Sequence, residues 1–362
     1  MKLTVKTDLL KDMVTRAVKG ASCNKLVPLT SMMAIQLANN KLTLHTTDMT
    51  NHLYVMQDKM LGDDFYVTVQ VEQFSKLIGR LTCENVTLEL KENSLEVIGN
   101  GTYNLELPLD ENGALVKFPD PFNSSNMPYP VTKQIELSTI QAILNTAKAS
   151  LATTMEIPCY TGYYIGDKIV TTDTYKICGI NIQMFDEPVL ISPEMMNLLD
   201  VMSDEKIDVT IDGNVIMFVT PDCVVYGYLM DSIGDFSIDA ISGLLETEFD
   251  SVCKVSKTEL LATLDRIALF VGTYDNKAIR LNFTPQGIDI SSKQTNGIET
   301  VGYTESSNFK AFTGFIDIDM LTVQLKAYTG DIVELHYGND LFISLVNGNT
   351  TQVIALLEDD AE

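Results

Sequence analysis

The chain has 362 residues, of which 45 % are hydrophobic and 20 % are charged, and its formal net charge is −24. This length allows two or three domains, each with a full core, and no stretch approaches the 18 apolar residues of a membrane span. The first residues, MKLTVKTDLLKDMV, contain no signal-peptide core, so we expect an intracellular, cytoplasmic protein. The six cysteines form no CxxC pair, which favours free thiols over a metal site or a disulfide framework.

The negative charge is spread unevenly along the chain. Residues 1–120 carry a net charge of −3, residues 121–245 carry −11, and residues 246–362 carry −10. A chain this acidic should repel nucleic acid unless its basic groups are gathered in one place. The first third is therefore the part least hostile to a polyanion.

Three helical patterns recur about 120 residues apart. They are predicted at residues 8–20, 138–150 and 256–271, where apolar residues follow three- and four-residue spacing. Each follows a short alternating strand and begins with a capping-type residue, which is Thr7 or Asp8, Ser138, and Ser256 respectively. The period is too long for a solenoid and indicates repeated domains.

Two strands follow each of these helices. Leu44, Ile169 and Ile290 occupy matching strand positions, at spacings of 125 and 121 residues. The first two copies end in Thr-Thr-Asp, at residues 46–48 and 171–173, whereas the third copy has Ser-Lys-Gln at residues 292–294.

A second helix is predicted in each copy, at residues 71–80, 193–202 and 317–328. Each leads into two alternating strands around a Gly, Asn or Asp turn, and Val86, Ile207 and Ile332 are spaced by 121 and 125 residues. Each third of the chain is thus a β-α-β-β-β unit made twice. We predict an α+β fold with three domains, 1–125, 126–246 and 247–362, each with two helices packed on antiparallel sheets. Free sheet edges invite pairing, which suggests closure into a ring with a symmetric partner.

This pattern resembles the bacterial sliding clamp, the beta subunit of the replicative DNA polymerase, over essentially the whole chain. The nearest local match is Thr172–Ile177, TDTYKI, where that family shows TD, a small residue, His, Arg and Leu; Phe118-Pro119 matches the family's Phe-Pro at the first domain junction. The resemblance implies a head-to-tail homodimer, closed around duplex DNA and placed by a clamp loader, that tethers the replicative polymerase. The divergence of the sequence suggests an outlying or phage-encoded member, acting in a bacterial or phage-infected cell without a membrane partner.

The resemblance also implies three sets of residues. A pocket for short peptides, between the second and third domains, would comprise Tyr160, Thr172, Thr174, Tyr175, Lys176, Ile177, Val353, Ala355 and Leu357. The DNA-facing groups would be Lys19, Lys25, Lys76, Arg80, Lys148 and Lys257. The dimer contact would use Leu105 and Leu107 of one chain, and Phe270 and Val271 of the other.

The charge pattern fits this hypothesis, because the six helical windows together carry a net charge of zero. If the helices line the ring, its bore is neutral and the acidity lies outside. DNA could then pass without the many phosphate contacts that would hinder sliding. In the first copy, we interpret Thr-Thr-Asp as a strand-to-loop turn only.

Nothing in the sequence favours an enzyme. Its three histidines belong to no HExxH motif, and neither GxSxG nor a phosphate-cradling loop occurs. Asp317-x-Asp319 begins a predicted helix, where acidic residues favour the helix dipole, so we interpret it as a cap and not a metal site. We therefore expect a protein without catalysis or cofactor. The alternative is a clamp-like scaffold or decoy that captures clamp partners without encircling DNA, motivated by Tyr175, Lys176 and the replacement of a family Pro by Ser237.

Overall fold

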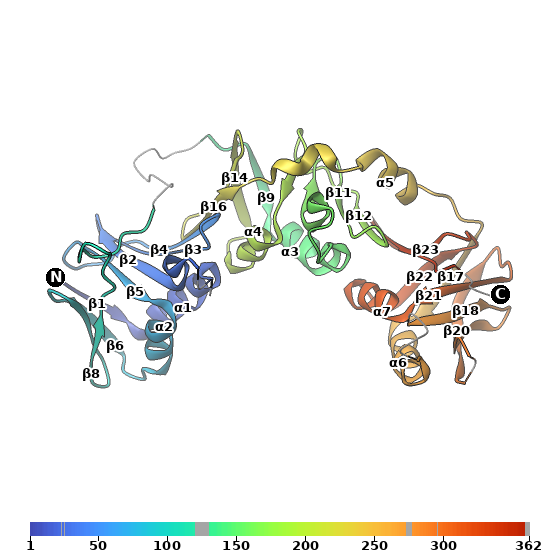
Figure 1. Cartoon of the computed structure of the whole chain (residues 1–362), viewed down its shortest axis with the longest axis horizontal. Helices are drawn as coiled ribbons and strands as arrows, with labels where there is room; N and C mark the ends of the chain where they lie inside the picture. Colours follow the sequence, from blue (N-terminus) through green and yellow to red (C-terminus); the bar gives the residue numbers. More distant parts are fainter. Residues whose placement is uncertain (23, 25, 120–129, 273–276, 295, 359–362) are drawn as a thin grey trace. The chain divides into compact units, whose positions relative to one another are not determined.

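The computed structural model describes residues 1–22, 24, 26–119, 130–272, 277–294 and 296–358 (Figure 1). Within these residues the chain forms the order β-α-β-β-β six times, twice in each of three repeats. The repeated α+β architecture expected from the sequence is thus confirmed.

The first repeat begins with a complete double unit. It comprises β1 (Lys2–Lys6), α1 (Thr7–Ala17), β2 (Met32–Ala38), β3 (Lys41–Thr47), β4 (Asn51–Gln57), β5 (Phe65–Gln70), α2 (Val71–Arg80), β6 (Asn85–Leu90), β7 (Ser94–Ile98) and β8 (Thr102–Glu106). Two 3₁₀ turns, Val18–Gly20 and Pro28–Ser31, lie between α1 and β2.

The second repeat has the same order of elements. It comprises β9 (Lys133–Glu136), α3 (Leu137–Thr146), β10 (Tyr163–Ile165), β11 (Ile169–Thr172), β12 (Lys176–Ile180), β13 (Val189–Ile191), α4 (Pro193–Leu198), β14 (Lys206–Asp212), β15 (Val215–Thr220) and β16 (Cys223–Tyr228). Its 3₁₀ turns Ala147–Ser150 and Pro158–Thr161 correspond to those of the first repeat.

The third repeat follows a helix that the sequence did not predict, α5 (Ile238–Leu245). It comprises β17 (Ser251–Ser256), α6 (Lys257–Ile267), β18 (Ala278–Phe283), β19 (Gly287–Ser292), β20 (Ile298–Ser307), β21 (Phe312–Asp317), α7 (Ile318–Ala327), β22 (Ile332–Tyr337), β23 (Phe342–Asn347) and β24 (Thr350–Ala355). The stretch 230–243, which the sequence presents as a link, therefore contains helical structure.

Strand pairing joins consecutive repeats at equivalent places. In the eight-stranded sheet, β4 of the first repeat pairs with β16 of the second, with His52 opposite Tyr226. In the twelve-stranded sheet, β12 of the second repeat pairs with β24 of the third, with Ile177 opposite Val353. A four-stranded sheet, β1-β6-β7-β8, completes the first repeat.

The chain forms two compact units, Met1–Ile140 with Glu194–Leu229, and Gln141–Pro193 with Met230–Glu362. The first contains the four- and eight-stranded sheets, and the second contains the twelve-stranded sheet. The second repeat is divided between them. The three domains with boundaries at residues 125 and 247 stay a prediction.

The helices cover one face of the sheets because their apolar residues recur at helical spacing. On α1 the buried side chains are Leu10, Met13, Val14 and Ala17, and α1 lies against α2, as Figure 1 shows. In the second unit α6 and α7 lie side by side in the same way, and α6 buries Leu260, Thr263, Leu264 and Ile267. No described helix is long and apolar enough to cross a membrane.

Two of the predicted helix caps form. The Ser256 hydroxyl accepts a hydrogen bond from the Glu259 N–H, and the Asp317 carboxylate accepts from the N–H groups of Asp319 and Met320. The prediction for α1 was wrong, because Lys6 precedes the helix and makes no side-chain cap bond. Asp8 lies in the first turn of that helix, where its charge still favours the dipole.

An ion pair reinforces the strand junction in the first unit. The Arg16 guanidinium on α1 donates to the Asp222 carboxylate at 2.6 Å and to the Val201 carbonyl at 3.0 Å. Burial alone would raise the pKa of Asp222, yet the hydrogen bond and charge of Arg16 bring it below its ordinary value. The pair connects α1 of the first repeat with the β15–β16 turn of the second.

Candidate functional site

The turn after β11 is built by its own polar side chains. The Thr172 hydroxyl accepts a hydrogen bond from the Thr174 N–H at 3.0 Å. The Asp173 carboxylate accepts from the N–H groups of Tyr175 at 3.0 Å and Lys176 at 2.7 Å. Thr174 has a φ of +81°, a conformation that costs a β-branched residue energy and persists because these bonds fix it.

The turn after β3 in the first repeat is the same turn. The Thr47 hydroxyl accepts from the Met49 N–H at 2.8 Å, and the Asp48 carboxylate accepts from Thr50 at 2.9 Å and Asn51 at 2.7 Å. Met49 has a φ of +83°. The two copies of Thr-Thr-Asp therefore specify one backbone geometry, in which a threonine and an aspartate accept the inward-pointing N–H groups.

The first threonine of each motif holds the strand to a helix. The hydroxyl of Thr46 donates to the carbonyl of Ala17 at 2.6 Å, and the hydroxyl of Thr171 donates to the carbonyl of Ala147 at 2.6 Å. Both threonines are fully buried, so these bonds satisfy groups that water cannot reach. All three residues of the motif thus have structural roles in both copies.

The side chains presented by the two turns differ. In the second repeat Tyr175 is 58 % exposed, whereas the equivalent position of the first repeat is Thr50. The Lys176 ammonium pairs with the Asp173 carboxylate within the turn, and the equivalent Asn51 amide donates to Asp48 at 2.9 Å. Lys176 is therefore engaged in shaping the turn, and Tyr175 is the side chain that the second turn offers to a partner.

The strands beside this turn carry a group of buried apolar side chains, here called the apolar floor. Ile177 and Val353 face each other across β12 and β24 and are both buried. They belong to one cluster with other buried residues of the second unit. Its members include Cys159, Tyr164, Val170, Leu190, Phe236, Ile241 and Phe342.

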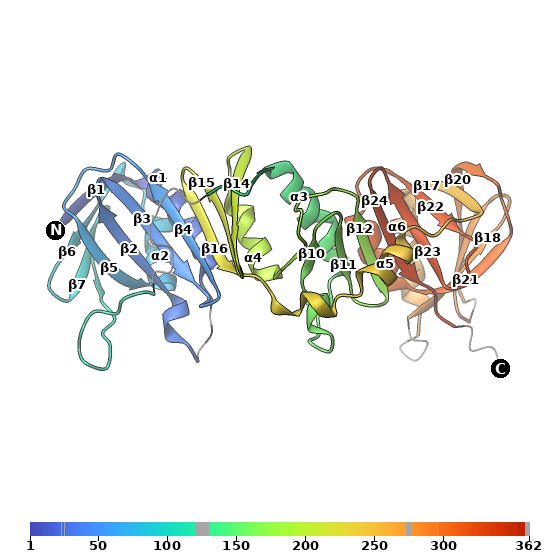
Figure 2. The same cartoon turned by 90° about the horizontal axis from the view of Figure 1, so that it is seen from above.

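An aromatic group borders this floor. Tyr160 is half-buried and meets the Phe236 ring edge-on, with ring centroids 5.3 Å apart, and Tyr164 stacks on Phe236 with centroids 5.0 Å apart. Helix α5 lies over β12 and β24, as Figure 2 shows. Gly179 on β12 makes this approach possible, because a Cβ there would lie 2.6 Å from the Leu245 side chain.

Backbone bonds fix the chain after β24. The Ala355 N–H donates to the Tyr175 carbonyl at 2.9 Å, which joins the turn to the last strand. The Leu357 N–H donates to the Phe315 carbonyl at 2.8 Å. Ala355 and Leu357 are half-buried, so each presents part of its side chain at the surface.

The structure thus brings most of the predicted pocket residues into one strand-turn-strand element and the strand beside it. These are Thr172, Thr174, Tyr175, Lys176, Ile177, Val353 and Ala355; Tyr160 contacts the same cluster, and Leu357 lies beyond the end of β24. Sequence reasoning missed Tyr164 and Phe236. Phe236 could have been found, because Phe118 occupies the corresponding place after the first repeat. Their role in binding a peptide stays a prediction.

Four of the six predicted DNA-facing groups are exposed, namely Lys19, Lys76, Arg80 and Lys148. Lys76 also pairs with Glu72 one helical turn earlier. Lys257 is different, since it is half-buried and its ammonium donates to the Tyr328 carbonyl at 2.5 Å. It therefore helps to hold α6 to the end of α7. Lys25 lies outside the described residues.

The predicted dimer residues fall into two groups. Leu105 on β8 and Leu107 beyond it are buried within their own repeat, so their side chains are not available to a partner. Phe270 is 50 % exposed and Val271 is half-buried. A Cβ at Gly297 would lie 2.9 Å from the Phe270 ring, which places that ring against the start of β20.

The described residues contain no group of three or more His, Cys, Asp or Glu side chains that could hold a metal ion. A buried histidine pair lies on β3 and β4 of the eight-stranded sheet, with His45 Nε2 and His52 Nδ1 3.0 Å apart. Burial, and to a lesser extent the neighbouring His52, lowers the pKa of His45 to about 3. Burial lowers the pKa of His52 to about 4 against the opposing charge of Asp48. Both rings are therefore neutral at physiological pH.

Comparison with known proteins agrees with this architecture. Residues 1–113 match the family model of the DNA polymerase III beta subunit, N-terminal domain. The solved sliding clamp of Bacillus subtilis superposes with a TM-score of 0.81 at 16 % identity, covering 99 % of each chain. The DNA polymerase III beta chain of Streptococcus pneumoniae gives 0.85 at 15 % identity, covering 99 % of this chain and 100 % of that one. That of Thermotoga maritima gives 0.81 at 16 % identity, covering 99 % of each.

The comparison with curated proteins finds no match. The resemblance expected from the sequence is nevertheless confirmed, because residues 1–113 match the beta-subunit family model and the whole chain has the fold of bacterial sliding clamps.

Proposed function

We propose that this protein is a DNA sliding clamp, a processivity factor that encircles duplex DNA as a head-to-tail homodimer. It tethers the replicative polymerase and other partners through the surface around Tyr175, and a clamp loader places it on DNA in the cytoplasm of a bacterial or phage-infected cell. It performs no chemistry. The observation that carries the proposal is the clamp fold over the full chain, in which the β4–β16 and β12–β24 junctions leave the equivalent strands β8 and β20 without such a junction among the described strands.

The unmatched edges follow from the repeat. Strand β16 pairs with β4 and β24 pairs with β12, so the last strand of one repeat meets the fourth strand of the repeat before it. The strands that remain are β8, the last of the first repeat, and β20, the fourth of the third repeat. Among the described strands β8 pairs only with β7, and the first half of β20, residues 298–302, pairs only with β19.

A second copy of the chain can supply both missing partners. Strand β8 of one copy would pair with β20 of the other, and the same contact formed twice closes a ring of six repeats. Exposed apolar side chains lie at this edge of the third repeat: Leu269 is 81 % exposed, Phe270 50 % and Ile298 63 %. Because Leu105 and Leu107 are buried, the first repeat would contribute mainly the backbone edge of β8.

The charge of the helices supports passage of DNA through such a ring. The six helical windows carry no net charge although the chain carries −24, and Lys19, Lys76, Arg80 and Lys148 are exposed on or beside helices. Each phosphate contact adds affinity that falls with salt, so a few contacts guide DNA without holding it. Encirclement, and not affinity, then keeps the protein on its substrate.

The surface around Tyr175 supports the tethering role. The exposed Tyr175, whose carbonyl is bonded to the N–H of the half-buried Ala355, suits an extended peptide with one or two apolar anchors. A polymerase held there returns to the primer end before it diffuses away, because tethering raises its effective concentration.

Topological retention tests the proposal. Protein dimers are allowed to dissociate and reassociate in the presence of nicked circular duplex DNA, and the complexes are separated from free protein by gel filtration in high salt. We expect protein to remain with the circle and to be lost when a restriction enzyme opens it. Equal retention on circular and linear DNA, or none on either, contradicts the proposal and favours a scaffold that captures partners without encircling DNA.

A further inference from the structure

The eight-stranded sheet has a hollow in the first repeat, on the face that carries His45. A cavity of about 320 Å³ is lined by residues of β2, β3, β4 and β5 and by the segment after β8. Its principal walls are Ala34, His45, Tyr54, Tyr66, Lys117 and Phe118. Next to it lies a larger depression of about 1060 Å³, with which it shares the lining residues Gln36, Thr43 and Tyr54.

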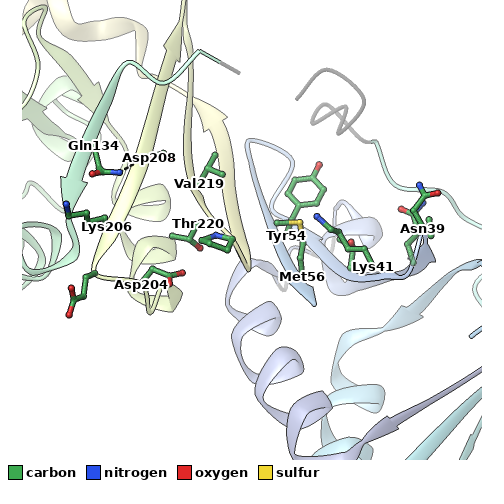
Figure 3. Close-up of a pocket in the computed structure, with 15 residues that line it drawn as sticks. Asn39, Lys41, Tyr54, Met56, Gln134, Asp204, Lys206, Asp208, Val219 and Thr220 are labelled. Carbon is green, nitrogen blue, oxygen red and sulfur yellow. Dashed lines mark hydrogen bonds between the residues drawn. The ribbon is translucent and has the colours of Figure 1, made fainter. Parts of the chain in front are cut away.

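The larger depression runs across the strand junction of the first unit. Figure 3 shows Tyr54, Met56 and Lys41 on one side, and Val219, Thr220 and Asp208 on the other. The two hollows together form an elongated surface on β-strands, with side chains of alternate residues facing outward. Such a shape accommodates an extended chain better than a compact ligand.

The repeat explains why the smaller cavity exists. The turns at residues 47–51 and 172–176 are equivalent, and so are the 3₁₀ turns Pro28–Ser31 and Pro158–Thr161 that precede β2 and β10. Counting from these turns, Ala34 corresponds to Tyr164. Phe118 correspondingly occupies the place of Phe236.

In the second unit the Tyr164 ring stacks on Phe236 at 5.0 Å and fills this place. In the first unit Ala34 is buried in one cluster with Phe118, and its methyl group replaces the ring. The first repeat therefore has an aromatic-walled space where the second repeat supplies an aromatic side chain of its own.

The walls are held in place before any ligand arrives. The His45 ring stacks on Tyr54 at 4.1 Å and meets Phe118 edge-on at 5.1 Å. The His52 Nδ1 atom lies at hydrogen-bond distance, 3.0 Å, from His45 Nε2. The Phe118 N–H donates to the Tyr66 hydroxyl at 2.9 Å. A preformed aromatic pocket favours an aromatic guest, because little conformational freedom is lost on binding.

One cation marks the rim. Lys117 is exposed and is the sole charged residue among those that line the smaller cavity. Among the described residues no carboxylate forms a salt bridge with it, whereas Lys41 pairs with Asp58 at 3.4 Å. A carboxylate next to the aromatic guest would meet this ammonium in a protein that is otherwise strongly acidic.

We propose that this hollow is a second recognition site, which binds an extended segment of a partner protein carrying an aromatic side chain next to an acidic residue. The aromatic side chain occupies the space left by Ala34, the acidic residue pairs with Lys117, and the exposed Gln36 and half-buried Thr43 face the peptide backbone. The site depends on the repeat and not on peptide capture at Tyr175, so the two proposals can fail separately.

The test uses the full chain and the probe acetyl-Gly-(4-fluoro-Phe)-Asp-Gly-amide, followed by the ¹⁹F line width. We expect broadening with the unaltered protein and an affinity about tenfold weaker or worse with Ala34→Tyr, which restores the ring found in the second repeat. Lys117→Glu, an exposed substitution that does not threaten folding, should weaken binding as well. Tyr175→Ala should leave the affinity unchanged.

Matched probes test whether the acidic residue and the extended backbone of the peptide are recognised. Replacing Asp by Asn in the probe should weaken its binding to the unaltered protein. The Lys117→Glu substitution should then have no effect on the affinity for the Asn probe. Acetyl-4-fluorophenylalanine amide alone should bind more weakly than the tetrapeptide. The proposal is overturned if the unaltered protein gives no broadening, if Ala34→Tyr and Lys117→Glu both bind as tightly as the unaltered protein, if Tyr175→Ala abolishes binding, or if the single amino acid binds as tightly as the peptide.

Discussion

The turns at residues 47–51 and 172–176 share their backbone hydrogen bonds and differ in the side chains they display. In both, a threonine and an aspartate accept N–H groups, and the residue after the aspartate has a φ near +80° (+83° and +81°). The first turn then presents Thr50, and the second presents Tyr175, 58 % exposed. The comparison teaches that the repeated motif builds the scaffold, and that the residues which differ between copies are the ones to examine for function.

The sheet faces beside the two turns show the same division. In the second repeat the Tyr164 ring packs on Phe236. In the first repeat the corresponding residue is Ala34, and the space of the ring is left open. The second turn is therefore predicted to display an anchor point above a filled floor, and the first to border a hollow.

The largest expected effect concerns the junction between chains. The junctions β4–β16 and β12–β24 lie within the chain, and the proposed β20–β8 junction needs a second copy. Phe270→Asp would place an unpaired charge in that interface at a cost of about 3–5 kcal/mol, so the dimer should dissociate at micromolar concentration. Analytical ultracentrifugation measures this. Phe309→Asp, an exposed phenylalanine beyond the other end of β20, should leave the dimer intact; equal behaviour of the two variants would mean that Phe270 is not at the interface.

The next effect separates the two turns. Tyr175→Ala combined with truncation after Ala355 should weaken capture of a fluorescent peptide with Leu and Phe anchors by about 2–4 kcal/mol, because a few anchors dominate such affinities. Thr50→Ala at the equivalent position should change nothing. Fluorescence anisotropy gives both affinities, and circular dichroism confirms the fold. If the first variant binds as tightly as the unaltered protein, the peptide site lies elsewhere.

The histidine pair belongs to the first repeat only, since Val170 and Ile177 occupy the equivalent places. The pKa values of His45 and His52 lie at about 3 and about 4, below the ordinary value near 6.5. Between each folded-state pKa and 6.5, the unfolded chain binds more protons than the folded one. Their contribution to stability is therefore complete above pH 6.5 and is lost as the pH falls, by at most about 1.4 kcal/mol per pH unit for each ring.

Urea unfolding of the chain between pH 7 and pH 4.5 measures this slope. The variant His45→Val/His52→Ile takes the side chains of the second repeat and should reduce the slope. An identical slope in both proteins would show that the rings do not remain neutral in the fold.

The smallest effect tests the equivalence of the turns directly. Asp48→Ala and Asp173→Ala each remove the acceptor of two backbone N–H groups, and each should lower the free energy of unfolding by about 1–2 kcal/mol. Urea unfolding compares them. The loss should be alike in both copies; an effect confined to Asp173 would mean that the first turn does not depend on its aspartate.

The repeat was predictable because short stretches of sequence are enough to define its helices and strands. Apolar spacing such as Leu10, Met13, Val14 and Ala17 defines each helix without reference to the rest of the chain, and two landmarks per copy gave a period of 121 to 125 residues. Both helices of every repeat appear at the predicted places. The resemblance also brought Tyr175, Ile177 and Val353 together, which β12 and β24 place side by side.

What could not be predicted depends on residues far apart in sequence. Arg16 and Asp222 pair across 206 residues, and no local pattern marks either one. The burial of Leu105 could not be predicted, because it depends on how β8 pairs and packs in the folded sheet. Helix α5 was not predicted, because Gly, Ser and Asp in residues 230–243 are typical of a link between domains. The helix is stabilised by its packing on β12 and β24, which the local sequence does not reveal.

The measurement that tests the central claim most directly is the molar mass in solution by light scattering, over a dilution series. The chain has a mass of 40.1 kDa, and a ring of six repeats requires two chains. We predict a mass of twice that value, held down to submicromolar concentration. A mass of one chain at every concentration would contradict the closed ring and with it the account of how the protein stays on DNA.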